Sequence, residues 1–247
     1  MSDLAQVAIV TGGARGIGEA VVRRFHHLGM HVVVADVLDN EGQQLAAELG
    51  TKATFCHLDV RKSEQWAEVV EVSSALGQLS VLVNNAGVLR FGSIEEQDPD
   101  EFRFVLDVNL TGAWLGMRAC GASLRAVGGV IVNVSSTAGL AGYSHIGAYV
   151  ASKWALRGIT KTAALEFADS GVRVCSVHPG PIRTPMTADF DDSLVVNQPI
   201  ARFGEPDEVA DMVEFVVMKA TFTTGAEFVI DGGALTGQAL AVPTSAN

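Results

Sequence analysis

Residues 7–18 read VAIVTGGARGIG, an apolar run that leads into four glycines. The run is short, continuous and rich in β-branched residues, which is typical of a strand buried on both faces. Residues 16–28 then place Ile17, Val21 and Phe25 at helical spacing, which predicts a helix. In a glycine-rich turn between such a strand and helix, the backbone turns sharply and its amides can face an anion such as a pyrophosphate.

The same alternation continues outward from this turn. The predicted strands are 7–11, 31–36, 53–57, 81–84, 129–134, 172–178 and 227–230. The predicted helices are 16–28, 41–49, 63–76, one or two within 100–127, 149–168 and 205–218. Continuous apolar strands separated by helices indicate a parallel sheet covered on both faces. The sequence therefore predicts one α/β domain over residues 1–247, a Rossmann-type doubly wound sheet of seven parallel strands with helices on both faces.

Composition narrows the class of protein. The chain has 247 residues, of which 48% are hydrophobic, so it can bury a large core without a disulfide or metal. Its net charge of −11 disfavours nucleic acid and anionic lipid as partners. Cys56, Cys120 and Cys175 show no metal-binding spacing. With no signal peptide and no apolar run long enough to span a bilayer, we expect a cytoplasmic protein without a metal or a membrane partner.

The end of the second strand decides how the glycine-rich turn is interpreted. The spacing of Gly12, Gly16 and Gly18 alone also fits an ordinary tight turn. Asp36, however, ends the second strand, where a carboxylate can accept hydrogen bonds from an adenosine ribose and repel a 2′-phosphate. Arg15 points the other way, because a cation there can serve a 2′-phosphate. No basic residue follows Asp36, so the sequence favours NAD over NADP as the cofactor.

Two further strand ends carry polar residues. Asp59 follows the third strand, and it can contact an adenine amino group or form the turn before the next helix. The fourth strand ends in Asn84 and Asn85, whose side chains can bridge neighbouring strand ends. Ala86 and Gly87 are small enough to leave room for a flat ligand. We expect a mostly structural role for this loop, which also shapes the floor of the adenosine site.

A tyrosine and a lysine provide candidate chemistry. Lys153 follows Tyr149 by four residues, so on a helix both side chains share one face. A phenol is a poor base at neutral pH, but a nearby ammonium lowers its pKa. Tyr149 can then exchange a proton with a substrate oxygen, and Lys153 can hold the nicotinamide ribose. Taken alone, so short a pattern also fits a half-buried tyrosine beside an exposed lysine.

Other polar residues extend this candidate site. Ser135 and Ser136 end the fifth strand, where a hydroxyl can stabilise charge on the same substrate oxygen, and the spacing does not separate the two. Asn109 lies inside a helical pattern, where asparagine is locally unfavourable. It is either exposed, or its amide holds something such as a water near Lys153.

Taken together, the chain resembles the classical short-chain dehydrogenase/reductase family over residues 7–233. The resemblance rests on TGGARGIG at 11–18, Asp36, residues 84–87, Asn109, Ser136, Tyr149, Lys153 and Pro179-Gly180. It implies that Tyr149 is the catalytic acid/base and that Ser136, rather than Ser135, polarises the substrate oxygen. It also implies that Lys153 lowers the tyrosine pKa and binds the ribose, and that Asn109 holds a proton-relay water.

The resemblance also implies that residues after the sixth strand line the nicotinamide carboxamide. The expected cofactor-binding residues are therefore Gly12, Arg15, Gly16, Ile17, Gly18, Asp36, Asp59, Val60, Asn85, Ala86, Gly87, Tyr149, Lys153, Pro179, Gly180, Ile182 and Thr184. Members of the family are usually tetramers. The resemblance thus implies a homotetramer whose interfaces use the helices within 100–127 and 149–168 and the last helix and strand.

Within the family, the chain is most similar to bacterial hydroxysteroid dehydrogenases of the 3α,20β type. The similar stretches are 35–39, 57–60, 151–154, 176–180 and 224–227. Residues 181–203 form the expected substrate-binding loop, which is short for that subfamily. Apolar residues in or beside it are Met186, Phe190, Leu194, Val195, Val196, Leu140, Tyr143 and Ile146. They either line a site for an apolar substrate or pack the loop onto the domain. The tail 235–247 is expected either to cover a neighbouring subunit's site or to be disordered.

The sequence therefore predicts an NAD(H)-dependent oxidoreductase that interconverts a secondary alcohol and a ketone on an apolar, steroid-like substrate through a Tyr-Lys-Ser site. One alternative is an NADPH-dependent 3-oxoacyl-carrier reductase, which would favour a basic residue after the second strand. Another is a dinucleotide-binding sensor without turnover, because a fold does not fix a function. The intact set of Ser136, Tyr149 and Lys153 argues against the sensor.

Overall fold

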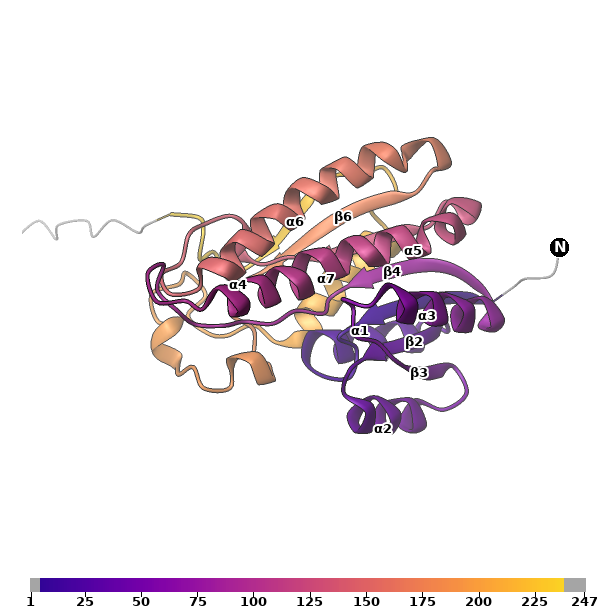
Figure 1. The fold of residues 1–247 in the computed structure, drawn as a ribbon, viewed down its shortest axis with the longest axis horizontal. Coiled ribbons are helices and arrows are strands. Elements are labelled where there is room, and N and C mark those ends of the chain that lie inside the picture. The colour runs from indigo at the N-terminus through magenta and orange to yellow at the C-terminus, as the bar shows by residue number, and fades with distance from the viewer. Residues whose placement is uncertain (1–4, 238–247) are drawn as a thin grey trace, which may run out of the picture.

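The computed structural model describes residues 5–237 and contains one sheet of seven parallel strands (Figure 1). Their order is β3-β2-β1-β4-β5-β6-β7. The strands are β1 (Gln6–Thr11), β2 (His31–Asp36), β3 (Ala53–His57), β4 (Gln78–Asn84), β5 (Val130–Val134), β6 (Arg173–Pro179) and β7 (Glu227–Ile230). The winding reverses where β1 pairs with both β2 and β4, and ligands bind at such a point in open α/β sheets. The predicted fold class is confirmed.

Helices cover both faces of the sheet. They are α1 (Gly16–His27), α2 (Asp39–Leu49), α3 (Ser63–Leu76), α4 (Pro99–Leu106), α5 (Gly112–Val127), α6 (Gly147–Glu166) and α7 (Pro206–Met218). Buried side chains of α1, α2 and α7 form one core with the sheet, and those of α3, α5 and α6 form the other. Within residues 5–237, no helix is both long enough and apolar enough to cross a membrane. Most of the predicted tail lies outside the described residues.

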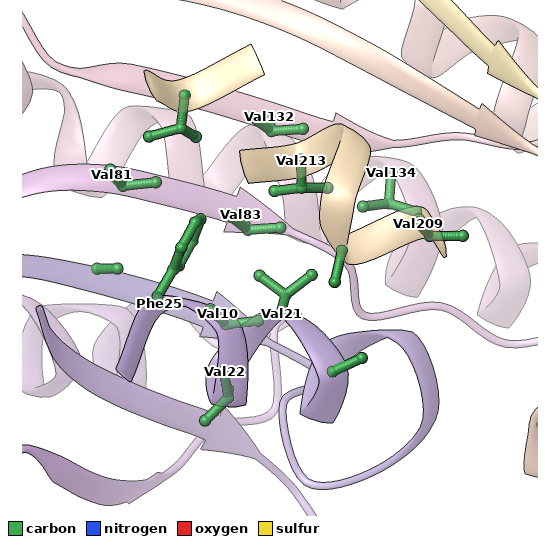
Figure 2. Close-up of a cluster of buried hydrophobic side chains, with 14 of the residues drawn as sticks. Val10, Val21, Val22, Phe25, Val81, Val83, Val132, Val134, Val209 and Val213 are labelled. Carbon is green, nitrogen blue, oxygen red and sulfur yellow. The ribbon is translucent and has the colours of Figure 1, made fainter. Parts of the chain in front are cut away.

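The strands supply both cores because successive side chains point to opposite faces. Ala8 and Val10 of β1 face α1 and α7, whereas Val7 and Ile9 face α3 and α5. Figure 2 shows the first core, where Phe25 of α1 lies among valines of the sheet. Full burial of one such side chain contributes roughly 1.5–3 kcal/mol. The continuous apolar pattern of the strands is thus explained by helices on both sides.

The segment 100–127 differs from a regular helix at one place. Between α4 and α5 the chain forms one π-helical turn over Asp107–Thr111, and Asn109 lies in it with 1% of its surface exposed. Single π turns are frequent at functional sites. Here the wider turn accommodates an asparagine whose amide bonds to neighbouring elements, so the locally unfavourable residue is neither exposed nor unpaired.

A row of buried amides crosses beneath the carboxyl ends of the central strands. Asn84 of β4 donates from Nδ2 to Oδ1 of Asn133 on β5, at 2.8 Å. Asn133 in turn donates to Oγ1 of Thr160 on α6, at 2.9 Å. This chain of hydrogen bonds, the amide row, confirms that Asn84 bridges neighbouring strand ends.

Candidate active site

A single cavity of about 880 Å³ runs along the carboxyl ends of the strands. Nearly all of the predicted cofactor and catalytic residues line it, from the glycine-rich turn after β1 to the loop after β6. The two exceptions are Gly18 and Asn109, which are buried behind the wall. The cavity has a cofactor end, formed by the turns after β1, β2, β3 and β4, and a substrate end, formed by longer loops.

The glycine-rich turn requires its glycines for different reasons. Gly12 and Gly16 have φ angles of +60° and +59°, which other residues rarely adopt. A Cβ on Gly12 would also lie 2.9 Å from Cα of Ala86. A Cβ on Gly18 would overlap the carbonyl oxygen of Gly12. Gly18 therefore acts through close packing of α1 against the turn, and not through direct contact with the cavity.

The end of β4 supports this turn. Nδ2 of Asn85 donates to the carbonyl oxygens of Thr11 and Gly12, each at 3.0 Å. Oγ1 of Thr11 accepts hydrogen bonds from the backbone N–H groups of Asn85 and Ala86, also at 3.0 Å. The side chain of Asn85 is thus engaged with the backbone, as the mostly structural prediction for this loop requires.

Asp36 lies at the end of β2 with 7% of its surface exposed, and it faces the cavity. Its Oδ2 accepts a hydrogen bond from the N–H of Ala14 at 2.9 Å, and its Oδ1 accepts one from Leu38 at 3.1 Å. Each carboxylate oxygen has a second lone pair that remains available for a ligand hydroxyl. Arg15, by contrast, is an exposed side chain at the cavity edge.

The carboxylate of Asp59 is held in a turn. It accepts hydrogen bonds from the backbone N–H of Arg61 at 3.1 Å and from the guanidinium of Arg61 at 2.6–3.1 Å. These contacts lower the pKa of Asp59. The turn role is therefore present, and because Asp59 and Val60 also line the cavity, the adenine contact stays a prediction.

Tyr149 and Lys153 of α6 face the same cavity as Ser136. Nζ of Lys153 lies 5.5 Å from the centre of the Tyr149 ring and donates to the carbonyl oxygen of Val134 at 2.9 Å. Lys153 is 3% exposed, so the exposed-lysine interpretation of the pattern is wrong. The tyrosine and the lysine are brought together, as the spacing predicts.

Burial dominates the titration of both groups. It lowers the pKa of Lys153 to about 8 and raises the pKa of Tyr149, whereas the nearby Ser136 side chain acts to lower the Tyr149 pKa. The pKa of Tyr149 is therefore raised in the protein without ligands, whereas the nearby ammonium of Lys153 is expected to lower it. The reason is that burial destabilises the phenolate by more free energy than the neighbouring groups contribute to stabilising it.

The two serines after β5 have different surroundings. Ser135 is buried, and its Oγ donates to the backbone carbonyl of Lys153 at 3.2 Å. Ser136 is half-buried, and its Oγ accepts a hydrogen bond from the N–H of Ala138 at 3.1 Å. The hydroxyl hydrogen of Ser136 therefore remains available beside Tyr149. The geometry thus favours Ser136 for contact with a substrate oxygen.

The amide of Asn109 has three protein partners. Its Oδ1 accepts from the N–H of Val88 at 2.8 Å. Its Nδ2 donates to the carbonyl of Val88 and to Oγ of Ser152, each at 3.0 Å. Both amide hydrogens are thus used to hold the loop after β4 against α6. A role of Asn109 in a proton relay stays a prediction.

The substrate end has mostly apolar walls. Five of the predicted apolar residues line it: Met186, Phe190, Leu194, Tyr143 and Ile146. This agrees with the interpretation that the loop lines a site for an apolar substrate. Other residues of that set do not line it: Leu140 and Val196 lie outside the cavity, and Val195 turns inward with 1% exposed.

The sequence reasoning missed residues in the loop after β4. Leu89 and Phe91 also line the substrate end, and the ring of Phe91 meets that of Phe190 edge to face at 6.1 Å. An irregular loop gives no periodic signal by which these residues could be found.

The fold and the position of this cavity are those of dinucleotide-binding proteins. A family model described as "Enoyl-(Acyl carrier protein) reductase" matches residues 12–235. A 3-alpha-(or 20-beta)-hydroxysteroid dehydrogenase of Mycobacterium bovis is 45% identical, covering 96% of this chain and 92% of that protein. A cyclohexanol dehydrogenase of Acinetobacter sp. is 41% identical (92% and 94%), and a trans-4-hydroxycyclohexanecarboxylate dehydrogenase of Sinomonas cyclohexanicum is 40% identical (95% and 95%).

The chain belongs to the short-chain dehydrogenase/reductase family, and it is an NAD(P)-dependent oxidoreductase of the alcohol dehydrogenase type. The predicted family and enzyme class are confirmed, as is the similarity to 3α,20β-type hydroxysteroid dehydrogenases.

Proposed function

We propose that the protein interconverts a secondary alcohol on an apolar ring and the corresponding ketone, with NAD(H) as the cofactor. The observation that carries this proposal is the convergence of Ser136, Tyr149 and Lys153 on the cavity that also contains the glycine-rich turn. The relatives support it, because their names share the oxidation of a hydroxyl group on a cyclic compound.

The residues at the cofactor end fit a nicotinamide dinucleotide. The turn at Gly12 and Gly16 offers backbone at positions where a side chain would clash or strain, Asp36 offers free lone pairs for a ribose, and Pro179 and Gly180 line the far part. When bound, the nicotinamide accepts or supplies the hydride. Tyr149 takes or gives the proton at its phenolic oxygen, and Ser136 donates a hydrogen bond to the substrate oxygen.

The choice of NAD rests on Asp36. The carboxylate is held in place by two backbone N–H groups, so it cannot turn away from a 2′-phosphate, which it would repel. The next two residues at the cavity wall, Val37 and Leu38, are apolar and offer no compensating cation. Arg15 is exposed at the cavity edge, where its guanidinium can contact the pyrophosphate instead.

The substrate end supports an apolar, uncharged ring. Among the residues that the structure describes, its lining contains no Asp, Glu, Lys or Arg, apart from the catalytic Lys153. Burying a charged group there would leave it unpaired, which costs several kcal/mol. The polar side chains at this end are Tyr143, Ser144, Asn197 and Gln198, which can hydrogen-bond a second neutral polar group on the ring.

We also propose a homotetramer. Large apolar side chains on α5, α6 and α7 are exposed in the single chain, with Trp114 at 44%, Trp154 at 47%, Leu165 at 80% and Phe215 at 46%. These are the elements at which the family resemblance puts its interfaces. Light scattering after size-exclusion chromatography tests this, and a monomer at micromolar concentration would contradict it.

The function is tested by screening cyclic secondary alcohols with NAD and, separately, NADP, following absorbance of the reduced cofactor. Tyr149→Phe keeps the ring but removes the exchangeable proton, so kcat is expected to fall by about 10²–10⁴-fold. NADH binding, measured by fluorescence titration, should change by less than about threefold. Retained turnover in this variant would exclude the mechanism, and no turnover of any alcohol by the wild type would favour a sensor.

A further inference from the structure

His178 is a fully buried histidine that the mechanism above does not use. It lies in β6, one residue before Pro179. Its Nδ1 is 3.1 Å from the carbonyl oxygen of Ser136, and its Nε2 is 2.8 Å from Oγ of Ser176. Burial lowers the pKa of His178, so the ring is neutral at pH 7.

The partners fix the tautomer of this ring. A carbonyl oxygen can only accept, so Nδ1 of His178 must carry the hydrogen that it donates to Ser136. In the neutral ring Nε2 then has no hydrogen, and it accepts the hydroxyl hydrogen of Ser176. Both ring nitrogens of the buried imidazole are satisfied, which holds the ring in one orientation.

The other contacts of Ser136 use its carbonyl oxygen and its Oγ as acceptors, but not its hydroxyl hydrogen as a donor. Its carbonyl also accepts from the N–H of Gly139 at 2.9 Å, and its Oγ accepts from the N–H of Ala138 at 3.1 Å. These contacts hold the backbone and the side chain of Ser136, and they leave its hydroxyl hydrogen free to be donated on the side of Tyr149.

We propose that His178 is a positioning residue that ties the catalytic-serine turn to the loop expected to face the nicotinamide. This inference rests on the proposed function. His178 is covalently followed by Pro179 and Gly180, which line the cavity, and Gly180 is itself anchored by its N–H to the carbonyl of Ile230 at 2.8 Å. The hydrogen bond from His178 thus adds to the backbone bond from the N–H of Ser135 to the carbonyl of Val177, at 2.8 Å, in holding the serine beside the cofactor loop.

A double-mutant cycle tests this role. His178→Leu removes both hydrogen bonds at similar volume, and kcat is expected to fall by about 10–100-fold, as for residues that orient a functional group. In a Ser136→Ala background the same change should cost less than about twofold, because the group that it positions is gone. His178→Asn, which retains a donor towards Ser136, should recover part of kcat. Equal losses in both backgrounds, or an unchanged kcat, would overturn the proposal.

Two controls separate this role from general damage. His27→Leu, at an exposed histidine at the end of α1, should leave kcat unchanged. If His178→Leu does not fold, His178→Asn and Ser176→Ala are measured in the same cycle.

A measurement on the wild type does not depend on turnover. Nitrogen NMR of histidine-labelled protein should show His178 protonated at Nδ1 and not at Nε2. The opposite tautomer would overturn the proposal, even if no alcohol were oxidised and the proposed function itself failed.

Discussion

The two ends of the cavity are built in different ways. The cofactor end consists of residues in or directly after strands, and its key side chains, Asp36 and Asn85, are bonded to backbone. The substrate end consists of loops whose apolar side chains are largely exposed, such as Phe91 at 63% and Met186 at 43%. The cofactor end is therefore rigid and suited to one constant ligand. The loops of the substrate end can change in sequence without disturbing the sheet. The relatives fit this division, because their names share an alcohol group and differ in the ring.

The largest effect is expected from an added methyl group at the cofactor end. Gly18→Ala places a Cβ against the carbonyl of Gly12, which shifts the turn, and displacements of this size can cost about 100-fold in function. We expect NADH affinity to fall by at least that factor in a fluorescence titration. The matched control is Gly142→Ala near the substrate end, where a Cβ meets no atom within 4 Å. If both variants bind NADH equally, the cofactor end is not the rigid one.

A smaller effect is expected from the carboxylate at the cofactor end. Asp36→Ala removes the repulsion of a 2′-phosphate, so the ratio of kcat/KM with NADPH to that with NADH should rise by about 10–100-fold, or about 1.4–2.7 kcal/mol. Asp39→Ala, at an exposed carboxylate paired with His57, is the control and should leave the ratio unchanged. An unchanged ratio in Asp36→Ala would mean that this carboxylate does not select the cofactor.

At the substrate end, Phe190→Ala should change specificity and leave the cofactor alone. The edge-to-face pair with Phe91 is lost, and such a pair contributes about 0.5–1.5 kcal/mol, so kcat/KM for cyclohexanol should fall by about 2–12-fold. A fused two-ring alcohol should lose less, because the site becomes larger. Phe222→Ala, at a fully exposed ring, is the control. A parallel loss of NADH affinity would contradict the division of the cavity.

The last effect is on the stability of the fold in acid and not on catalysis. Arg157 donates to the carbonyl of Gly139 in the turn after β5 and pairs with Glu227, and its guanidinium lowers the pKa of Glu227 to about 2. A lowered carboxyl pKa stabilises the fold above the ordinary value of 4.5, and this stabilisation is lost as the pH falls towards 2. Glu227→Gln should therefore lower the free energy of unfolding by about 1–3 kcal/mol at pH 7 and by much less near pH 2.

The control for this prediction lies near the substrate loop. The pKa of Glu208 is also lowered to about 2, by its pair with Arg202, but that pair is exposed to solvent. Solvent screens exposed pairs, so Glu208→Gln should lower the melting temperature less than Glu227→Gln. Equal shifts of the melting temperature at pH 7 would mean that the Arg157–Glu227 pair is no stronger than a surface ion pair.

The sequence predicted the fold well because the strands are buried on both faces and leave a strong apolar pattern. It also predicted which residues gather at the cofactor end of the cavity, where local rules apply: Gly12 has a positive φ, and Asp36 ends a strand. It did not separate Ser135 from Ser136 by spacing, since that choice depends on which hydroxyl α6 binds. It gave no role to His178, because the partner of that ring is 42 residues away in the chain.

The amide row has a consequence for how the sheet assembles. Asn84 and Asn133 meet only when β4 and β5 are paired as they are here, with Asn84 opposite Asn133. A shift of one residue would break this hydrogen bond, and a buried amide left without a partner costs about 1–3 kcal/mol. The same two side chains thus penalise misaligned pairings during folding. The carboxyl ends of β4 and β5 are therefore aligned by the protein itself and need no ligand to align them.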